Sequence, residues 1–190
     1  MTPEVGVSEQ GDSLLPEPVL DDGIVRLRRW TATDLPCVKA ASDEGVIPET
    51  TTVPPAFTEE AGREWIERQH SRVQQEQGWS LAVTEMPVGA AVGCAVLLLR
   101  PQEGVAGVGY WLAPSARGRG LASRAVALLT EWGLREVALA RVEAWVEPGN
   151  QASVDVLTRC GFDYEGRLRS FLSFPTRRAD ALVFSRVDTA

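Results

Sequence analysis

The feature that most limits how this chain can fold is an apolar stretch followed by two closely spaced glycines and then by an amphipathic stretch. The segment VGYWL at 108–112 is typical of a buried strand, and the residues from Leu121 onward have helical periodicity. The connection APSARGRG lies between them and carries its two arginines and two glycines together at 117–120. The first N–H groups of a helix have no partner within the helix and favour anions, so this strand-to-helix corner predicts an anion-binding site.

Three other interpretations of the corner can be compared with the anion site. A nucleoside-triphosphate loop requires Gly-Lys-Ser/Thr, and no such tripeptide occurs. A dinucleotide motif could use Gly118, Gly120 and Ala122 with Glu147 as a ribose ligand, but the glycines do not follow the strand directly and hairpin-like strands precede them. The third alternative is a solvent-exposed basic turn that caps a core helix.

The remaining pattern predicts a mixed α/β domain with a mostly antiparallel sheet of about seven strands and four helices. The predicted order is βααβββαβαββ. Strands are expected at 24–30, 79–85, 88–99, 107–113, 140–146, 162–173 and 177–187, and helices at 31–42, 58–77, 121–137 and 150–160. Residues 43–56, rich in Pro, Thr and Glu, are expected to form a loop.

Charge is distributed unevenly along the 190 residues, whose net charge is -7. Residues 1–22 hold six acids and no base, which leaves 20 acids against 19 bases for the rest of the chain. We therefore expect a disordered acidic tail at 1–22 and a single domain at 23–190. The nearly neutral domain argues against a nucleic-acid partner.

The compartment and the source can also be predicted from composition. No apolar run is long enough to span a membrane, and the N-terminus lacks the basic-then-apolar order of a signal peptide, so we expect a cytoplasmic protein. One lysine against eighteen arginines, with abundant Ala, Val and Gly, suggests a GC-rich bacterial genome.

The cysteines and the histidine do not suggest metal or nucleophilic chemistry. Cys37, Cys94 and Cys160 are odd in number, widely spaced and without neighbouring metal ligands, which predicts neither disulfides nor a metal site. His70 is the only histidine and lies in a polar helical stretch, so we expect it on the surface.

Several segments together resemble the GNAT superfamily of acetyltransferases. RGRGLA at 117–122 is similar to the family's Arg/Gln-x-x-Gly-x-Gly/Ala motif, and the segments VRLRRWTATDLP, VGYWLAPSARGRGLASRAV, RVEAWVEPGNQASVDVLTRCGF and EGRLR follow the family's order. The resemblance covers about residues 23–187 and is nearest to the branch of ribosomal-protein N-terminal acetyltransferases. It implies a GNAT fold and acetyl-coenzyme A (acetyl-CoA) as co-substrate, without a metal.

The resemblance also implies roles for individual residues. The pyrophosphate of coenzyme A (CoA) would be bound by the corner itself, and the strand before it would lie along the pantetheine arm, with the backbone of Leu112 as donor to the developing oxyanion. The implied cofactor-binding residues are Leu112, Ala113, Arg117, Gly118, Arg119, Gly120, Leu121, Ala122 and Asn150.

Ser153 is the implied donor to the departing CoA thiolate. It shares a helix face with Val156, Leu157 and Cys160, which predicts an inward-facing hydroxyl that needs a partner. Two structural alternatives stay open: Asn150 as an N-cap only, and a hydroxyl that bonds a backbone carbonyl.

The amine acceptor and its general base are less well defined. Some relatives place a carboxylate in the sixth strand, but residues 169–174 (RSFLSF) contain no acid, so Glu143 is the substitute candidate, with a solvated strand face as its alternative. Asp180 matches an acid common in this branch, with a structural role as its alternative. Pro48, Thr51, Val53 and Phe57 are candidates for lining the acceptor groove, and a packing or turn role is the equal alternative for each of them.

The sequence therefore predicts a transfer of acetyl from acetyl-CoA to a primary amine, on a protein N-terminus or a small molecule, by direct attack in a ternary complex. The alternative is a noncatalytic acyl-CoA sensor or interaction domain. A homodimer is compatible with the six tryptophans, although their spread through predicted elements favours core positions.

Overall fold

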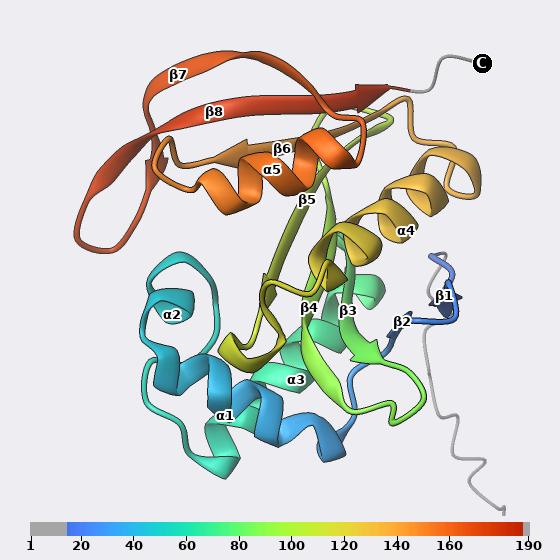
Figure 1. The fold of residues 1–190 in the computed structure, drawn as a ribbon, viewed down its shortest axis with the longest axis vertical. Helices are drawn as coiled ribbons and strands as arrows, with labels where there is room; N and C mark the ends of the chain where they lie inside the picture. The colour runs from blue at the N-terminus through green and yellow to red at the C-terminus, as the bar shows by residue number, and fades with distance from the viewer. Residues whose placement is uncertain (1–14, 188–190) are drawn as a thin grey trace, which may run out of the picture.

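The computed structural model describes residues 15–187, which form eight strands and five α-helices around one central sheet (Figure 1). The strands are β1 (Leu20–Asp21), β2 (Val25–Arg28), β3 (Gly78–Glu85), β4 (Ala91–Leu99), β5 (Val105–Leu112), β6 (Arg141–Val146), β7 (Asp163–Ser173) and β8 (Arg178–Val187). The helices are α1 (Leu35–Glu44), α2 (Val46–Thr50), α3 (Glu59–Gln74), α4 (Leu121–Arg135) and α5 (Gln151–Arg159), with short 3-10 turns at Ala32–Asp34 and Pro114–Ala116.

The sheet has the strand order β1-β2-β3-β4-β5-β6-β8-β7, and all neighbours are antiparallel except β5 and β6. These two central strands pair in parallel only from Val105↔Arg141 to Gly107↔Glu143. Beyond that point they diverge, as Figure 1 shows. The mixed, mostly antiparallel sheet predicted from the sequence is confirmed. We call the region where β5 and β6 are unpaired, beyond Gly107 and Glu143, the opening between the two halves of the sheet.

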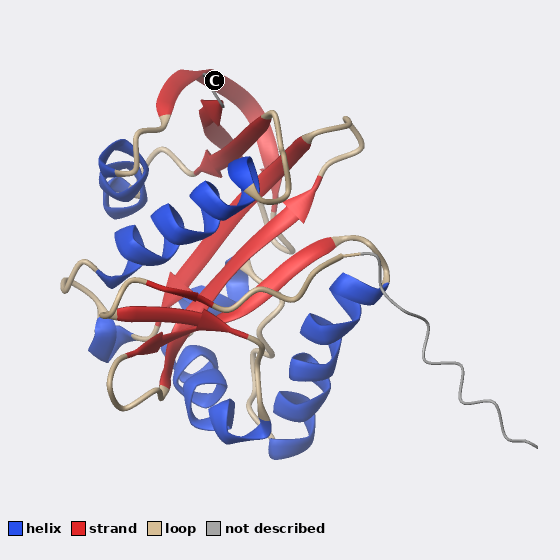
Figure 2. Ribbon diagram, turned by 90° about the vertical axis from the view of Figure 1, so that its right-hand side faces the viewer, coloured by secondary structure: helices blue, strands red, loops and turns tan. Residues whose placement is uncertain are grey.

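Helices cover both faces of this sheet (Figure 2) and divide the core into two clusters. On one face, α4 contributes Leu121, Ala125 and Leu129, which pack against alternate residues of the central strands. On the other face, α1 and α3 pack around Trp30 and Trp65, whose rings meet edge to face at a centroid distance of 4.9 Å. The first cluster includes residues of both β5 and β6, among them Val108, Leu112 and Val142, and so joins the two halves of the sheet.

Two elements were not expected from the sequence. The predicted loop at 43–56 contains α2, because Ile47 is buried and the Glu44 carboxylate accepts hydrogen bonds from the Val46 and Ile47 amides. The predicted tail at 1–22 lies partly outside the described residues, but its last part includes β1, which pairs with β2. Pro16 there accepts a hydrogen bond from Trp79 Nε1 at 2.7 Å.

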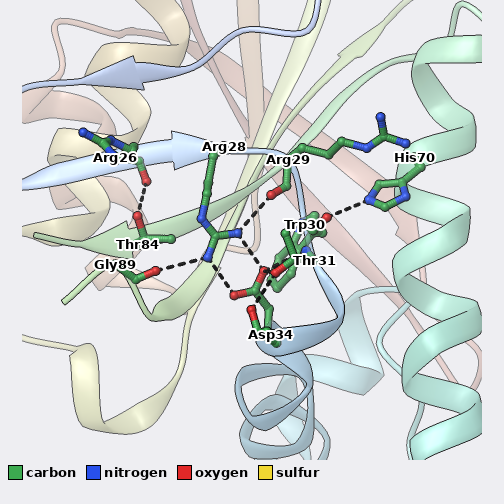
Figure 3. A network of polar contacts seen from close by, with 10 residues as sticks. Arg26, Arg28, Arg29, Trp30, Thr31, Asp34, His70, Thr84 and Gly89 are labelled. Atoms are coloured by element: carbon green, nitrogen blue, oxygen red, sulfur yellow. Dashed lines mark hydrogen bonds and ion pairs between the residues drawn. The ribbon is translucent and has the colours of Figure 1, made fainter.

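A buried ion pair fixes the start of α1 to the sheet (Figure 3). Both guanidinium nitrogens of Arg28 on β2 donate to the carboxylate of Asp34, at 2.7 and 2.8 Å. The Asp34 carboxylate also accepts from the Thr31 amide at 2.8 Å, and its side chain is only 2% exposed. Burial opposes ionisation of Asp34, but the bonds from Arg28 and Thr31 outweigh it and hold its pKa below the usual value.

His70 is half-buried, which differs from the expected surface position. Its Nε2 lies 2.9 Å from the Trp30 carbonyl oxygen, so the ring links α3 to the segment after β2 (Figure 3). Cys37, Cys94 and Cys160 are free and buried. Residues 15–187 contain no cluster of three or more His, Cys, Asp or Glu suited to a metal ion. None of the helices in this range combines the length and the apolar character that crossing a membrane requires.

Candidate active site

The corner between β5 and α4 has the backbone conformation that its glycines allow. Gly118 and Gly120 have φ of +73° and +75°, and Gly120 is the N-cap of α4. A non-glycine residue pays about 1–2 kcal/mol in this left-handed region. No side chain caps α4, and a Cβ at either glycine would meet nothing within 4 Å. The first N–H groups of α4 therefore face an approach without side chains, which suits an anion.

The two arginines of the corner are directed to protein groups. Arg117 Nε donates to the Leu112 carbonyl oxygen at 3.0 Å, and its Nη1 donates to Glu44 at 2.9 Å. Arg119 forms an ion pair with Glu85 at the end of β3. Both arginines therefore pair with carboxylates of the protein, and their implied role toward the pyrophosphate stays a prediction. Arg117 thus fixes the end of β5 to the C-terminus of α1.

Leu121 and Ala122 enter the site through their backbone alone. The Leu121 side chain is buried in the core, and Ala122 packs against the same cluster. Both belong to the first turn of α4, where N–H groups have no intrahelical partner. Their amides thus extend the row of donors that begins at the two glycines.

Leu112 lies where strand geometry frees an amide for a ligand. The Ala113 amide donates to the Val92 carbonyl oxygen at 2.9 Å, so its N–H belongs to the ladder with β4. Because N–H groups alternate between the two edges of a strand, the Leu112 N–H points toward β6. The β5–β6 pairing ends at Gly107, five residues earlier. The Ala113 N–H therefore makes a ladder bond to β4, whereas the Leu112 N–H does not face β4.

Asn150 and Ser153 begin α5 on the other wall of the opening. Asn150 is the N-cap, and its Oδ1 accepts the Ser153 amide at 3.1 Å. The capping role that the sequence left open is therefore present, and it leaves the side-chain NH2 available for a second role. The Ser153 hydroxyl lies 2.7 Å from the hydroxyl of Tyr110 on β5, so its partner is a side chain and not a backbone carbonyl.

The sequence analysis did not identify Tyr110 as a site residue. Its hydroxyl bridges β5 to α5, and burial raises the pKa of Tyr110 to about 12. A signal was present: Val108, Tyr110 and Leu112 share one face of the predicted strand, and a tyrosine among buried apolar residues needs a hydrogen-bond partner.

Glu143 lies where the two central strands begin to separate, opposite Gly107. Its Oε1 accepts from Arg100 Nε at 3.1 Å, and its Oε2 lies 3.6 Å from Arg141 Nε. The Arg100 guanidinium also lies over the Trp145 ring, 3.8 Å from its centroid. Two arginines therefore hold the carboxylate, which is 14% exposed.

Comparison with known proteins agrees with this geometry. Residues 25–163 match the family described as "Acetyltransferase (GNAT) domain". The chain belongs to the GNAT family. The expectation drawn from the corner and its flanking motifs is confirmed.

The individual proteins that resemble this GNAT chain match it either over part of its length or at low sequence identity. A protein of Bacillus licheniformis named "Uncharacterized N-acetyltransferase p20" is 36% identical over 92 residues, which are 48% of this chain and 52% of that protein. The chain thus spans about half the length of that curated relative. The structure of RimL, a ribosomal L7/L12 α-N-protein acetyltransferase, in complex with CoA has a TM-score of 0.78 at 18% identity and covers 90% of this chain and 98% of its own. Mycobacterium smegmatis RimJ in complex with CoA-disulfide has a TM-score of 0.77 at 24% identity and covers 90% and 86%.

The expected acceptor loop of this GNAT domain is partly a core element. Val53 is 2% exposed and packs in the cluster of Trp30 and Trp65, so of its two alternatives the packing role holds and the groove position does not. The Thr51 hydroxyl donates to the Ile47 carbonyl oxygen at 2.7 Å and ends α2. Pro48 and Phe57 are half-buried.

Asp180 holds the β7–β8 hairpin together. Its carboxylate accepts from the Ser170 amide and from Arg167 Nε, each at 2.7 Å, and these bonds lower its pKa. This arrangement agrees with a structural role.

Proposed function

We propose that this GNAT protein is an acetyl-CoA-dependent N-acetyltransferase that moves the acetyl group to a primary amine. The observation that carries the proposal is the corner at Gly118 and Gly120, which the short 3-10 turn Pro114–Ala116 separates from a strand whose edge is released from β6. The corner suits the charged end of the nucleotide, and the released edge of β5 suits an extended arm. The two features fit the two chemically different parts of one ligand.

The residues present fit CoA at each point that the proposal needs. The α4 N-terminus offers a row of backbone N–H groups, and the space around the two glycines is open, since a Cβ at either would meet nothing within 4 Å. Leu112 offers its amide at the edge of the opening, and Asn150 and Ser153 offer polar groups from the other wall. When bound, acetyl-CoA supplies the acetyl group as an activated thioester.

The proposed mechanism is direct attack by the acceptor amine. The Leu112 amide stabilises negative charge that develops on the thioester oxygen in the transition state, where such an interaction accelerates the reaction most. The Ser153 hydroxyl donates a hydrogen bond to the sulfur as the bond to carbon breaks. The amine nitrogen becomes attached to the acetyl carbon and loses a proton to water, because Glu143 is held by Arg100 and Arg141.

The acceptor is a primary amine of either of two classes, a protein N-terminus or a small molecule. An N-terminal amine, with a pKa of about 7.7–8.0, is already partly neutral at pH 7, whereas a lysine-like amine near about 10.4 is almost fully protonated. A site without a dedicated base favours the N-terminal class. The similarity to RimL and RimJ supports the same class, while cytoplasmic location and a homodimer stay predictions.

The experiment measures release of CoA thiol from acetyl-CoA with N-terminal peptides, polyamines and aminoglycosides, against a control without acceptor. We expect turnover with N-terminal peptides and a product whose mass increases by one acetyl group. Calorimetry with CoA is run in parallel. Binding of CoA without turnover on any amine would contradict the transferase and support the acyl-CoA sensor.

A further inference from the structure

The contact between Tyr110 and Ser153 joins the two walls of the opening at the proposed reaction centre. Tyr110 lies on β5 and Ser153 in the first turn of α5, 43 residues later. The oxygen atoms of their hydroxyls are 2.7 Å apart, and the Tyr110 oxygen is 3.2 Å from the Ser153 carbonyl oxygen. The serine amide is bound to the Asn150 cap at the same time. Ser153 is therefore held through both its backbone and its side chain.

Only one hydrogen can lie between the two hydroxyl oxygens, so the direction of this bond decides what Ser153 can do. If Tyr110 donates to Ser153 Oγ, the serine hydrogen is left for a third atom. If Tyr110 donates to the carbonyl oxygen, the serine hydrogen is used on Tyr110. O–H···O bonds are usually about 2.7–2.8 Å and rarely exceed about 3.0 Å, so the distances of 2.7 and 3.2 Å favour the first arrangement.

The environment of Tyr110 makes it a donor that keeps its own proton. Burial raises its pKa to about 12, so it stays a neutral phenol at physiological pH. Its ring packs against the apolar core cluster that includes the buried residues of α4, and its hydroxyl is the polar group that needs a partner. A hydrogen bond donated into Ser153 Oγ also polarises the serine O–H and strengthens the bond that this group donates.

We propose that Tyr110 is a positioning residue that donates to Ser153 Oγ and thereby directs the serine hydrogen to the sulfur of CoA. The inference rests on the proposed function, in which the carbon–sulfur bond breaks and the electron pair stays on sulfur. Ser153 donates a hydrogen bond to this thiolate, which later takes a proton from water. Tyr110 neither gains nor loses a proton in the step.

The test measures the ionisation of the CoA thiol while CoA is bound, which requires no acceptor and no turnover. CoA labelled with 13C at the carbon next to sulfur reports the thiol pKa through its chemical shift as the pH is varied. We expect the wild-type protein to lower this pKa relative to free CoA, because a donor to sulfur favours the thiolate. Ser153→Ala should raise the bound pKa by about one unit, the size of one hydrogen bond to a charged group.

Tyr110→Phe is the decisive variant, because it removes only the phenolic oxygen. We expect it to raise the bound thiol pKa by about half as much as Ser153→Ala and to change CoA affinity by less than about twofold. A lowered or unchanged thiol pKa would overturn the proposal, since a serine released from Tyr110 would then donate to sulfur equally well or better. Tyr164→Phe, at the other tyrosine, is the matched control because Tyr164 is 56% exposed on β7.

Kinetics supply the second readout. Tyr110→Phe should lower kcat about fivefold or more with little change in KM for acetyl-CoA, and should lower it no further in a Ser153→Ala background. Equal effects in both backgrounds would overturn the positioning role, because Tyr110 would then act independently of Ser153. A protein that shifts the thiol pKa as expected but acetylates no amine would contradict the transferase while supporting the contact. Failure of the wild type to bind CoA would overturn both.

Discussion

Replacing Gly120 by alanine separates the cost of a strained backbone from the loss of an anion site. At Gly120 φ is +75°, and a Cβ meets nothing within 4 Å, so the cost of the methyl group is conformational and not steric within the protein. The left-handed region costs about 1–2 kcal/mol for alanine, and the less flexible unfolded chain returns about 0.4–1 kcal/mol. We expect a net loss of stability of about 1 kcal/mol, which lowers Tm by about 2–4 °C in a chain of this size.

The same change should weaken CoA binding by about fivefold or more. A residue that leaves the left-handed region at the N-cap turns the first N–H groups of α4 away from a shared ligand. The loss of about 1 kcal/mol of helix N-terminal interaction corresponds to about fivefold in Kd. Calorimetric titration with CoA measures the affinity, and thermal denaturation followed by circular dichroism measures the stability.

Gly104→Ala is the matched control. Gly104 has φ of +70°, and a Cβ there lies at an ordinary distance of 3.5 Å from the Ala140 Cβ. It precedes β5, at the opposite end of the strand from the corner. We expect a similar loss of stability and unchanged CoA affinity. Equal weakening of CoA binding in both variants, or unchanged binding in Gly120→Ala, would refute the anion site.

Two further predictions concern carboxylates. Asp34→Asn should cost about 2–3 kcal/mol at neutral pH, since it replaces the buried anion that Arg28 binds. The pKa of Asp34 is lowered in the folded state, so its contribution to the free energy of unfolding is present above the unfolded pKa of about 3.9 and is lost as the pH falls through the folded pKa. Urea unfolding should therefore show the stabilities of wild type and variant converging in acid. A difference in stability that does not change with pH would contradict this. Glu143→Gln should lower kcat less than about threefold with an unchanged pH profile, because Arg100 and Arg141 hold the carboxylate, whereas a loss above tenfold would restore Glu143 as the base.

The long periodic segments could be predicted from the sequence because local pattern and tertiary burial agree in them. The predicted helix from Leu121 is α4, with Leu121, Ala125 and Leu129 on its buried face. The short helix α2 could not be predicted in this way, since its five residues include a proline and show no full turn of periodicity. Its stability comes from the burial of Ile47 and from the cap that Glu44 supplies.

The site could be predicted where its chemistry is local to the chain. The glycines of the corner and the Asn150 cap both follow from short-range rules about helix N-termini. The partners of the side chains could not be predicted, because they come from distant segments. Arg117 meets Glu44 across 73 residues, and Tyr110 meets Ser153 across 43. No periodicity in one sequence specifies which acid or hydroxyl will lie opposite.

The three residue pairs that join β5 to β6 divide β5 into two parts with different neighbours. From Val105 to Gly107 the strand is tied on both edges and joins the two halves of the sheet. From Val108 to Leu112 it is tied to β4 on one edge only. Substitutions in the first part affect the pairing between the two halves of the sheet, whereas substitutions in the second part affect a strand edge that is not paired with β6. One strand thus serves both as the junction between the two halves of the sheet and as an edge of the proposed CoA site.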